Sequence, residues 1–376
     1  MDCSLYIHIP FCISKCAYCD FFSRPYKEVP DSYIDALCRE LSYRFNEFSV
    51  KSLSTIYIGG GTPSLLKASQ FKKLFEHIRS SVKVNEECEI TVEVNPDDVN
   101  EGLLKTLEVC GINRISCGIQ SLNDKALKRA CRRADSETNL QALDCFRNYW
   151  KGQLSLDLIS GLPEESQESL LQGLETVCRE KPAHISLYSL TIEEKTPFGR
   201  QLEEGKLTYD FDAADRLWLS GRDFLEKQGY QWYEVSNFCL PGKECLHNLG
   251  YWNHKNYLGC GSGACGSIYK EDGSGLRWTN TTDIDEYIKQ SKAPQTSELI
   301  DLETSQFEFF MMGLRKHKGV SEEEYKKLFG QAFPETFIYL FNKWKERGLC
   351  ILRQDGRYAM SREGMLFLNR FLEELF

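Results

Sequence analysis

The chain has no long apolar run, no low-complexity tract and no excess of positive charge, and each absence excludes a class of protein. No apolar segment approaches the ~18–20 residues that span a bilayer. With 41% apolar residues in a chain of 376, disordered and fibrous folds are excluded. Lys and Arg number 46 against 55 Asp and Glu, a net charge of −9. Because the basic residues are also dispersed, we expect no nucleic acid as a partner.

The N-terminus lacks the features of an export signal. The first ten residues, MDCSLYIHIP, contain neither a basic segment nor a small-residue cleavage site. We therefore expect a cytoplasmic protein whose sixteen cysteines are reduced thiols and metal ligands rather than disulfides. Cys38, Cys110 and Cys145 lie in apolar periodic segments and are interpreted as core thiols.

Short β-rich segments alternate with helical patterns over the first 238 residues. Strands are expected at 5–9, 55–58, 89–94, 114–119, 154–159 and 184–190. This alternation predicts right-handed βαβ units and a parallel sheet. The fold class is therefore α/β, with an open (β/α)6 partial barrel over residues 1–238. In barrels of this kind the chemistry lies in the loops after the carboxyl ends of the strands.

The alternation ends after residue 238. Residues 239–298 read as a Gly- and aromatic-rich connecting region, in which SKAPQTSE at 291–298 is interpreted as a linker. Helical patterns near 304–316, 321–329 and 335–347 precede two short strands and a final helix. This order predicts a smaller, mostly helical, winged-helix-like C-terminal domain over residues 299–376. Ser321 and Glu324 have the spacing of a capping box.

Cys12, Cys16 and Cys19 form a C-x3-C-x2-C cluster directly after the first strand. Three thiolates in eight residues cannot all pair in a local disulfide, and they are one ligand short of a closed tetrahedral zinc site. They can hold three irons of a [4Fe–4S] cluster and leave the fourth iron open to another molecule. On the spacing alone, a zinc site completed by His8 or by a distant residue is the alternative.

With Tyr18 just before its last cysteine, this cluster resembles that of the radical S-adenosyl-L-methionine (SAM) family. The resemblance implies that the open iron chelates the amino and carboxylate groups of SAM. One-electron reduction then releases a 5′-deoxyadenosyl radical, so an electron donor is an expected partner. The resemblance also implies SAM contacts by Tyr6, by Tyr18 and by the run Gly60, Gly61 and Thr62 at the end of the second strand. On its own that run would be a simple tight turn.

Polar residues also occur at the ends of later strands, at Glu93, Gln120, Arg132 and Asp157. Each alone would be an ordinary loop residue, but together they would converge on the mouth of the barrel. In the resembling family the corresponding positions surround the ribose, carboxylate and adenine of SAM. Ala134 departs from the family pattern, because relatives commonly carry a histidine there.

The resemblance narrows to the coproporphyrinogen-oxidase-like branch of the family and covers nearly the entire chain. It runs through YIHIPFC, GGGTPS, NPDD, INRISCGIQS, DLISGLP, YEVSNF and GLR. True oxygen-independent coproporphyrinogen III oxidases carry a further cysteine two residues beyond the cluster and a substantial N-terminal extension. In this chain that position is Phe21, and the cluster begins at residue 12.

His247, Asn248, Tyr251 and Trp252 in HNLGYW match the HNxxYW signature of the heme chaperones in this branch. A histidine can ligate heme iron or attach heme covalently, and aromatic rings can stack on a porphyrin face. We therefore expect heme contacts at His247, Tyr251 and Trp252.

A G-x-G-x-x-G pattern at Gly261, Gly263 and Gly266 resembles a dinucleotide-binding motif. No clear strand precedes it and no clear helix follows it in the sequence. We therefore interpret it as a turn near the heme segment.

The leading interpretation is a heme chaperone that retains a [4Fe–4S] cluster and a SAM site. Its expected partners are heme and heme-acceptor proteins, with transfer expected at the membrane. One alternative is an oxidase that forms protoporphyrinogen IX by radical decarboxylation of two propionates. Another is a radical SAM enzyme that acts on a different substrate.

Overall fold

The computed structural model describes residues 1–290 and 294–375 and is built on a twelve-stranded sheet. The strand order is β14-β13-β12-β11-β1-β4-β5-β6-β7-β8-β10-β9. Its centre consists of six parallel strands, β1 (Asp2–Ile9), β4 (Ser52–Gly60), β5 (Lys83–Val94), β6 (Arg114–Gln120), β7 (Gln153–Ser160) and β8 (His184–Ser189). All six predicted strands are confirmed, and with them the α/β class and the open barrel.

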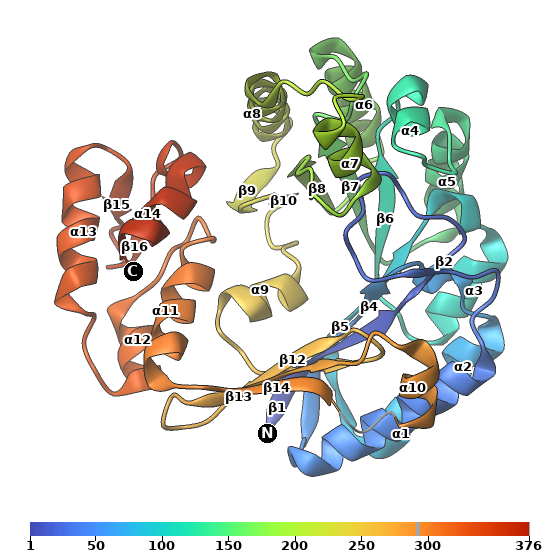
Figure 1. Ribbon diagram of the computed structural model, residues 1–376, viewed down its shortest axis with the longest axis horizontal. Helices are drawn as coiled ribbons and strands as arrows, with labels where there is room; N and C mark the ends of the chain where they lie inside the picture. The colour runs from blue at the N-terminus through green and yellow to red at the C-terminus, as the bar shows by residue number, and fades with distance from the viewer. Residues whose placement is uncertain (291–293, 376) are drawn as a thin grey trace.

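Helices cover the outer face of this barrel (Figure 1). They are α1 (Asp31–Glu47), α2 (Ala68–Ser81), α3 (Glu101–Val109), α4 (Asp124–Arg129), α5 (Ser136–Tyr149), α6 (Gln167–Arg179), α7 (Pro197–Glu203) and α8 (Phe211–Lys227). In α6 the buried residues Leu170, Leu174 and Val177 recur at helical spacing, so one stripe of the helix packs on the sheet. The same periodicity made the longer helices predictable.

One edge of the barrel is closed by a short antiparallel pair, β9 (Gln231–Glu234) and β10 (Asn237–Cys239). The helix α9 (Leu246–Trp252) follows and lies between the barrel and the C-terminal helices (Figure 1). At the start of the barrel, β2 (Phe11–Cys12) pairs with β3 (Arg24–Pro25).

The connecting region extends the sheet at its other edge. β11 (Tyr257–Cys260) lies parallel to β1, and β12 (Cys265–Tyr269), β13 (Gly275–Asn280) and β14 (Pro294–Ile300) continue antiparallel, with α10 (Ile284–Lys289) between the last two. The linker expected over 291–298 is therefore wrong from residue 294 onward, and 291–293 lie outside the described residues.

The glycines of this region predict loops, but in the structure several of them permit close packing of strands. A Cβ on Gly259 would lie 1.8 Å from the carbonyl oxygen of Cys265, so only glycine permits the pairing of β11 with β12. Gly261 and Gly263 form the turn between these strands with φ of 108° and 77°. A strand does precede the turn, but β12 follows it in place of a helix, so a dinucleotide fold is excluded.

The C-terminal segment consists of α11 (Leu302–Gly313), α12 (Glu322–Phe329) and α13 (Glu335–Glu346), then the hairpin β15 (Cys350–Leu352) and β16 (Tyr358–Met360), and finally α14 (Leu368–Leu375). Its core is aromatic, with the rings of Phe310 and Phe337 stacked at 4.2 Å. Only half of the predicted capping box is present: Ser321 Oγ accepts from Glu324 N at 3.1 Å, but the Glu324 carboxylate pairs with Arg357. Across the described parts of the chain, no helix is both long and apolar enough to cross a membrane.

Candidate functional site

The three cysteines predicted as cluster ligands lie in one loop at the carboxyl end of β1. The base of the loop is closed by the pairing of β2 with β3 and by Tyr26 N, which donates to Cys12 O at 2.8 Å. Within the loop Cys19 N donates to Cys16 O at 3.2 Å. All three thiols are free and half-buried.

A cavity of about 370 Å³ opens at the carboxyl ends of the barrel strands, and the three thiols line it. Nearly all of the predicted SAM residues line the same cavity, namely Tyr18, Gly60, Gly61, Thr62, Glu93, Gln120, Arg132 and Asp157. Tyr6 is the exception, because its hydroxyl bonds to His8 Nδ1 at 2.9 Å and does not reach the cavity wall. Residues of β4, β5, β6 and β7 and of the loop after β1 are thus brought to one place.

The surroundings of the thiols suit a [4Fe–4S] cluster. Thr62 Oγ1 donates to Cys12 Sγ at 3.4 Å, and Arg132 Nη1 donates to Cys16 Sγ at 3.5 Å. Donors of this kind stabilise thiolate sulfur, and a cationic neighbour offsets its charge. Burial raises the pKa of Cys19, so the bound irons would have to supply the charge that keeps this sulfur ionised.

The zinc alternative fits the structure less well. Both ring nitrogens of His8 are engaged, Nδ1 with the hydroxyl of Tyr6 and Nε2 with the carbonyl oxygen of Phe22, each at 2.9 Å. Over residues 1–290 and 294–375, no three His, Cys, Asp or Glu side chains are arranged to hold a metal ion. A cluster needs no such arrangement, because each thiolate binds a different iron.

Unsatisfied polar atoms in the cavity point to a polar ligand beside the cluster. Gln120 Oε1 and Arg132 Nε are buried and have no hydrogen-bond partner among the described residues. Gln120 also has a φ of 66°, a left-handed backbone that is uncommon for a side chain of this size. Buried polar atoms are normally paired, so SAM, which carries donors and acceptors, fits this wall.

Two of the carboxyl groups that line the cavity, Glu93 and Asp157, are held by hydroxyl and amide donors. Glu93 accepts from Tyr57 OH at 2.8 Å and from Gly60 N at 3.0 Å. Burial raises the pKa of Glu93 to about 7, and the charge of Asp157 adds to this. Asp157 accepts from Ser116 and Ser186 at 2.7 Å each. Burial also raises the pKa of Asp157, and the serine donors oppose this shift.

The glycines at 60 and 61 are also required for close packing of the backbone, apart from any contact with SAM. A Cβ on Gly61 would lie 2.6 Å from the carbonyl oxygen of Phe11, and one on Gly60 would lie 2.5 Å from the ring of His8. The end of β4 therefore packs directly against the base of the cluster loop.

Sequence reasoning missed several residues that line the cavity. Asn95 joins two predicted residues, because its Nδ2 donates to Thr62 Oγ1 and its Oδ1 accepts from Arg132 Nη2, both at 3.1 Å. Its position directly after β5 was the available signal. Tyr188 of β8 also lines the cavity, as does Phe21, which is 70% exposed.

The predicted heme segment lies on α9, away from this cavity. The His247 ring is only 1% exposed, with Nδ1 bonded to Thr55 Oγ1 at 2.8 Å and Nε2 bonded to Tyr251 OH at 2.9 Å. It also stacks on the ring of Tyr57 at 5.0 Å. Burial lowers the pKa of His247 to about 3, so the ring is neutral. Iron can reach His247 only if one of its two hydrogen bonds breaks.

Trp252 has a different environment from the other two predicted heme residues. It lines a second cavity of about 1000 Å³ between α9 and the C-terminal helices, as does His254, which the sequence did not single out. The structure thus separates Trp252 from His247 and Tyr251.

Comparison with known proteins agrees with this geometry. The family model described as the radical SAM superfamily matches residues 6–177. The heme chaperone HemW of Escherichia coli strain K12 is 36% identical over 372 residues, covering 98% of this chain and 97% of the relative. This chain belongs to the HemW family of radical SAM proteins.

Other relatives match over a similar length. The heme chaperone HemW of Buchnera aphidicola subsp. Schizaphis graminum is 34% identical, covering 98% of this chain and 97% of the relative. The mitochondrial radical S-adenosyl methionine domain-containing protein 1 of Danio rerio is 31% identical, covering 99% of this chain and 86% of that protein.

The fold is shared beyond the HemW family. The structure of coproporphyrinogen III oxidase (HemN) from Escherichia coli superposes with a TM-score of 0.83 at 22% identity, covering 99% of this chain and 89% of that one. The model of the HemN C-terminal domain matches residues 300–367, which lie within the segment expected to form the C-terminal domain.

Proposed function

We propose that this chain is a heme chaperone, which binds heme and transfers it to acceptor proteins. The observation that carries the proposal is the full-length similarity to several proteins named heme chaperone HemW, at 33–36% identity in Escherichia coli, Bacillus subtilis and Haemophilus influenzae. The likeness to the oxidase HemN, at 22% identity, supports only the shared fold.

The cavity at the barrel mouth supports a retained [4Fe–4S] cluster and SAM site. Cys12, Cys16 and Cys19 would hold three irons, and the bound cluster would supply an open iron that chelates SAM and accepts one electron. Arg132 and Gln120 line the remaining space and would orient the polar groups of SAM. The buried, serine-held carboxyl of Asp157 closes the same wall.

The position of the helix α9, between the barrel and the second cavity, supports a heme site there. His247 bonds to Thr55 of β4 and to Tyr251, and this anchors α9 on the barrel. Trp252, at the end of the helix, lies at the second cavity. Ligation of iron by His247 stays a prediction, as does contact of Tyr251 with heme.

The remaining partners follow from this function and stay predictions. A heme chaperone with a reducible cluster needs an electron donor and a heme acceptor, and we expect transfer at the membrane. We expect the chain in the cytoplasm and without nucleic acid. Cell fractionation tests the location, and cross-linking in intact cells tests the membrane acceptor.

Two assays on anaerobically reconstituted protein test the proposal. In the first, hemin is titrated and then transferred to apomyoglobin as a generic acceptor. In the second, coproporphyrinogen III is incubated with SAM and a reductant. We expect stoichiometric heme binding, transfer, and no conversion of coproporphyrinogen III at a catalytic rate. Robust formation of protoporphyrinogen IX would overturn the chaperone function in favour of the oxidase.

A further inference from the structure

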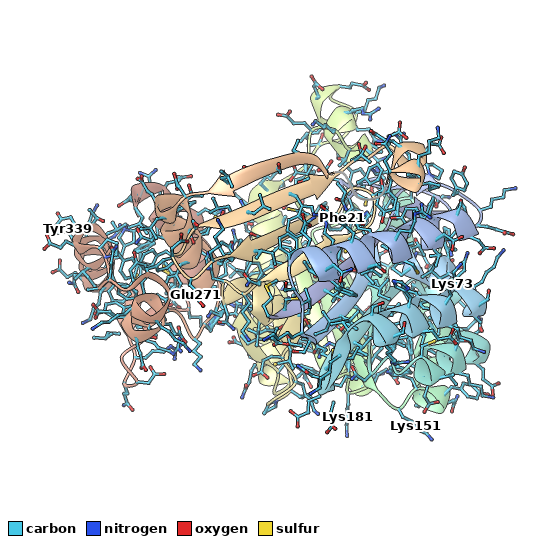
Figure 2. All side chains as sticks on the ribbon, turned by 90° about the horizontal axis from the view of Figure 1, so that it is seen from below. Phe21, Lys73, Lys151, Lys181, Glu271 and Tyr339 are labelled. Atoms are coloured by element: carbon cyan, nitrogen blue, oxygen red, sulfur yellow. The ribbon has the colours of Figure 1, made fainter. Side chains whose placement is uncertain are left out.

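The cavity between α9 and the C-terminal helices, which we call the α9 groove, has the size of a ligand site. Its volume of about 1000 Å³ lies at the upper end of the ~300–1,000 Å³ typical of ligand pockets. Trp252, Tyr269 and Phe309 contribute aromatic surface, and the first residues of β1 form part of its floor. Figure 2 shows Glu271, another lining residue, beside the C-terminal helices. These rings give a groove that is otherwise lined by many polar and charged side chains a face on which a large, flat molecule can pack.

His254 is an unusual residue in this groove. Its side chain is only 7% exposed, yet neither ring nitrogen has a hydrogen-bond partner among the described residues. Its φ of 55° places it in the left-handed region, which few residues other than glycine adopt. Its ring lies 3.8 Å from that of Tyr269. A buried histidine with both nitrogens free calls for a missing partner.

The charge of the groove is opposite to that of the whole chain. Six cationic and four acidic side chains line it, although the chain carries a net charge of −9. Lys316 is only 6% exposed and donates to the uncharged amide oxygen of Asn253. The negative charge of Glu324 favours protonated Lys316, but Glu324 is already paired with Arg357. An incoming carboxylate would supply the missing countercharge.

Resting on the proposed heme-chaperone function, we propose that heme occupies the α9 groove, with His254 as a ligand of its iron and Lys316 paired with a propionate. One ring nitrogen of His254 binds iron, and the other turns toward the carboxylate of Glu308, now 4.0 Å from Nε2. Carboxylates commonly orient metal-bound histidines in this way. Glu308 is itself fixed by Tyr269 OH at 2.8 Å and Arg277 Nη2 at 2.6 Å.

Ligation of heme iron by His254 is a different assignment from ligation by His247. The ring of His247 already has a partner at each nitrogen, whereas that of His254 has none. The two residues lie at opposite ends of α9 and the turn that follows it. Variants of the two therefore give separable results.

The test is a hemin titration of the full chain, carrying its cluster, followed by absorption and electron paramagnetic resonance spectra. We expect His254→Ala and His254→Gln to shift the Soret band and to weaken binding by at least the about 10–100-fold that loss of a group supporting a metal ligand costs. Added imidazole should restore the wild-type bands in His254→Ala. Lys316→Gln should weaken binding without shifting the bands.

Matched variants exclude general damage. His77→Gln and Lys73→Gln change the same residue types on α2, and Figure 2 shows Lys73 on the far side of the barrel from Glu271. They should leave heme binding unchanged, and iron content and SAM affinity should be unchanged in every variant.

The proposal fails if both His254 variants keep the wild-type Soret band and heme affinity. It also fails if His247→Gln loses the band and the affinity while the His254 variants keep them. Absence of heme binding in the wild-type chain would instead contradict the proposed function itself.

Discussion

Arg132 shows how one side chain ties several parts of the cluster site together. Its Nη1 donates to Cys16 Sγ at 3.5 Å, and its Nη2 donates to Gly118 O at 2.7 Å and to Asn95 Oδ1 at 3.1 Å. The guanidinium thus joins the cluster loop to the ends of two strands, while its Nε remains free for a ligand. No lysine can make this set of contacts, because a lysine has a single nitrogen.

At the residue scale, the first prediction concerns the thiols. Replacing Cys12, Cys16 or Cys19 by Ala should abolish the cluster, because each thiolate is needed for one iron. The measurements are iron content, visible absorbance and the paramagnetic signal after reduction. Cys145→Ala on α5 is the matched control and should keep a full cluster. A normal cluster in all three variants would refute the ligand assignment.

A second residue-scale prediction follows from Glu93, whose pKa burial raises to about 7. SAM carries a net positive charge, so it favours the ionised carboxylate. Between pH 6 and pH 8 the ionised fraction of such a group rises by about tenfold, and we expect SAM affinity to rise by about the same factor. Isothermal titration at both values measures it. Glu93→Gln should flatten the dependence, whereas Glu108→Gln on the surface of α3 should not.

Without SAM, the carboxyl of Glu93 should make the free energy of unfolding fall as the pH rises, whereas SAM affinity rises with pH. Its pKa is higher in the folded chain than its ordinary value of 4.5, so the folded state holds the proton more tightly. Its contribution to the free energy of unfolding is complete below 4.5 and is lost as the pH rises through about 7. The loss between pH 6 and pH 8 is on the order of 1 kcal/mol. Denaturant unfolding of the wild type and Glu93→Gln at both values shows whether the difference exists.

At the element scale, the sequence predicts the helices and strands whose buried residues recur at the spacing of that element. The parallel strands are short β-rich runs, and helices such as α6 carry an apolar stripe, so both could be predicted. The extension β11 to β14 could not, because its glycines serve close packing: a Cβ on Gly266 would lie 2.2 Å from the Trp278 ring. His247 shows a second limit, since only the fold reveals that Thr55 and Tyr251 occupy both its nitrogens.

The sheet extension gives an element-scale prediction. Gly259→Ala should destabilise the chain by about 1–3 kcal/mol, the usual cost of overpacking, because its Cβ would meet backbone rather than a movable side chain. Thermal unfolding measures the change. Gly173→Ala on α6 is the control, since a Cβ there meets neighbours only at 3.8 Å or more. An unchanged melting temperature for Gly259→Ala would show that β11 and β12 can separate at little cost.

At the scale of the whole molecule, the C-terminal domain is held on the barrel at several points. Arg362 Nη2 pairs with Glu226 of α8 at 2.8 Å, and the ring of His317 lies 4.1 Å from that of Trp232 on β9. His317 N also donates to Tyr233 O at 3.0 Å. These contacts join the C-terminal segment to α8 and β9 at the edge of the barrel.

Because the cluster cavity and the α9 groove have separate walls, their ligands should bind independently. We expect Cys12→Ala, which lacks the cluster, to bind heme with wild-type affinity, and SAM not to displace heme from the wild type. Parallel hemin titrations with and without SAM check both statements. A large loss of heme affinity in Cys12→Ala would place heme at the barrel mouth.

The strand β1 reaches both places, because Asp2 and Ser4 line the α9 groove and Ile9 leads into the cluster loop. Ser4 and Ile9 are five residues apart in this strand, which is about 17 Å at ~3.3 Å per residue. A heme in the groove and a cluster at the barrel mouth would therefore lie at opposite ends of one strand. The fold would thus keep a heme cargo apart from the reducible cluster while both are bound to the same chain.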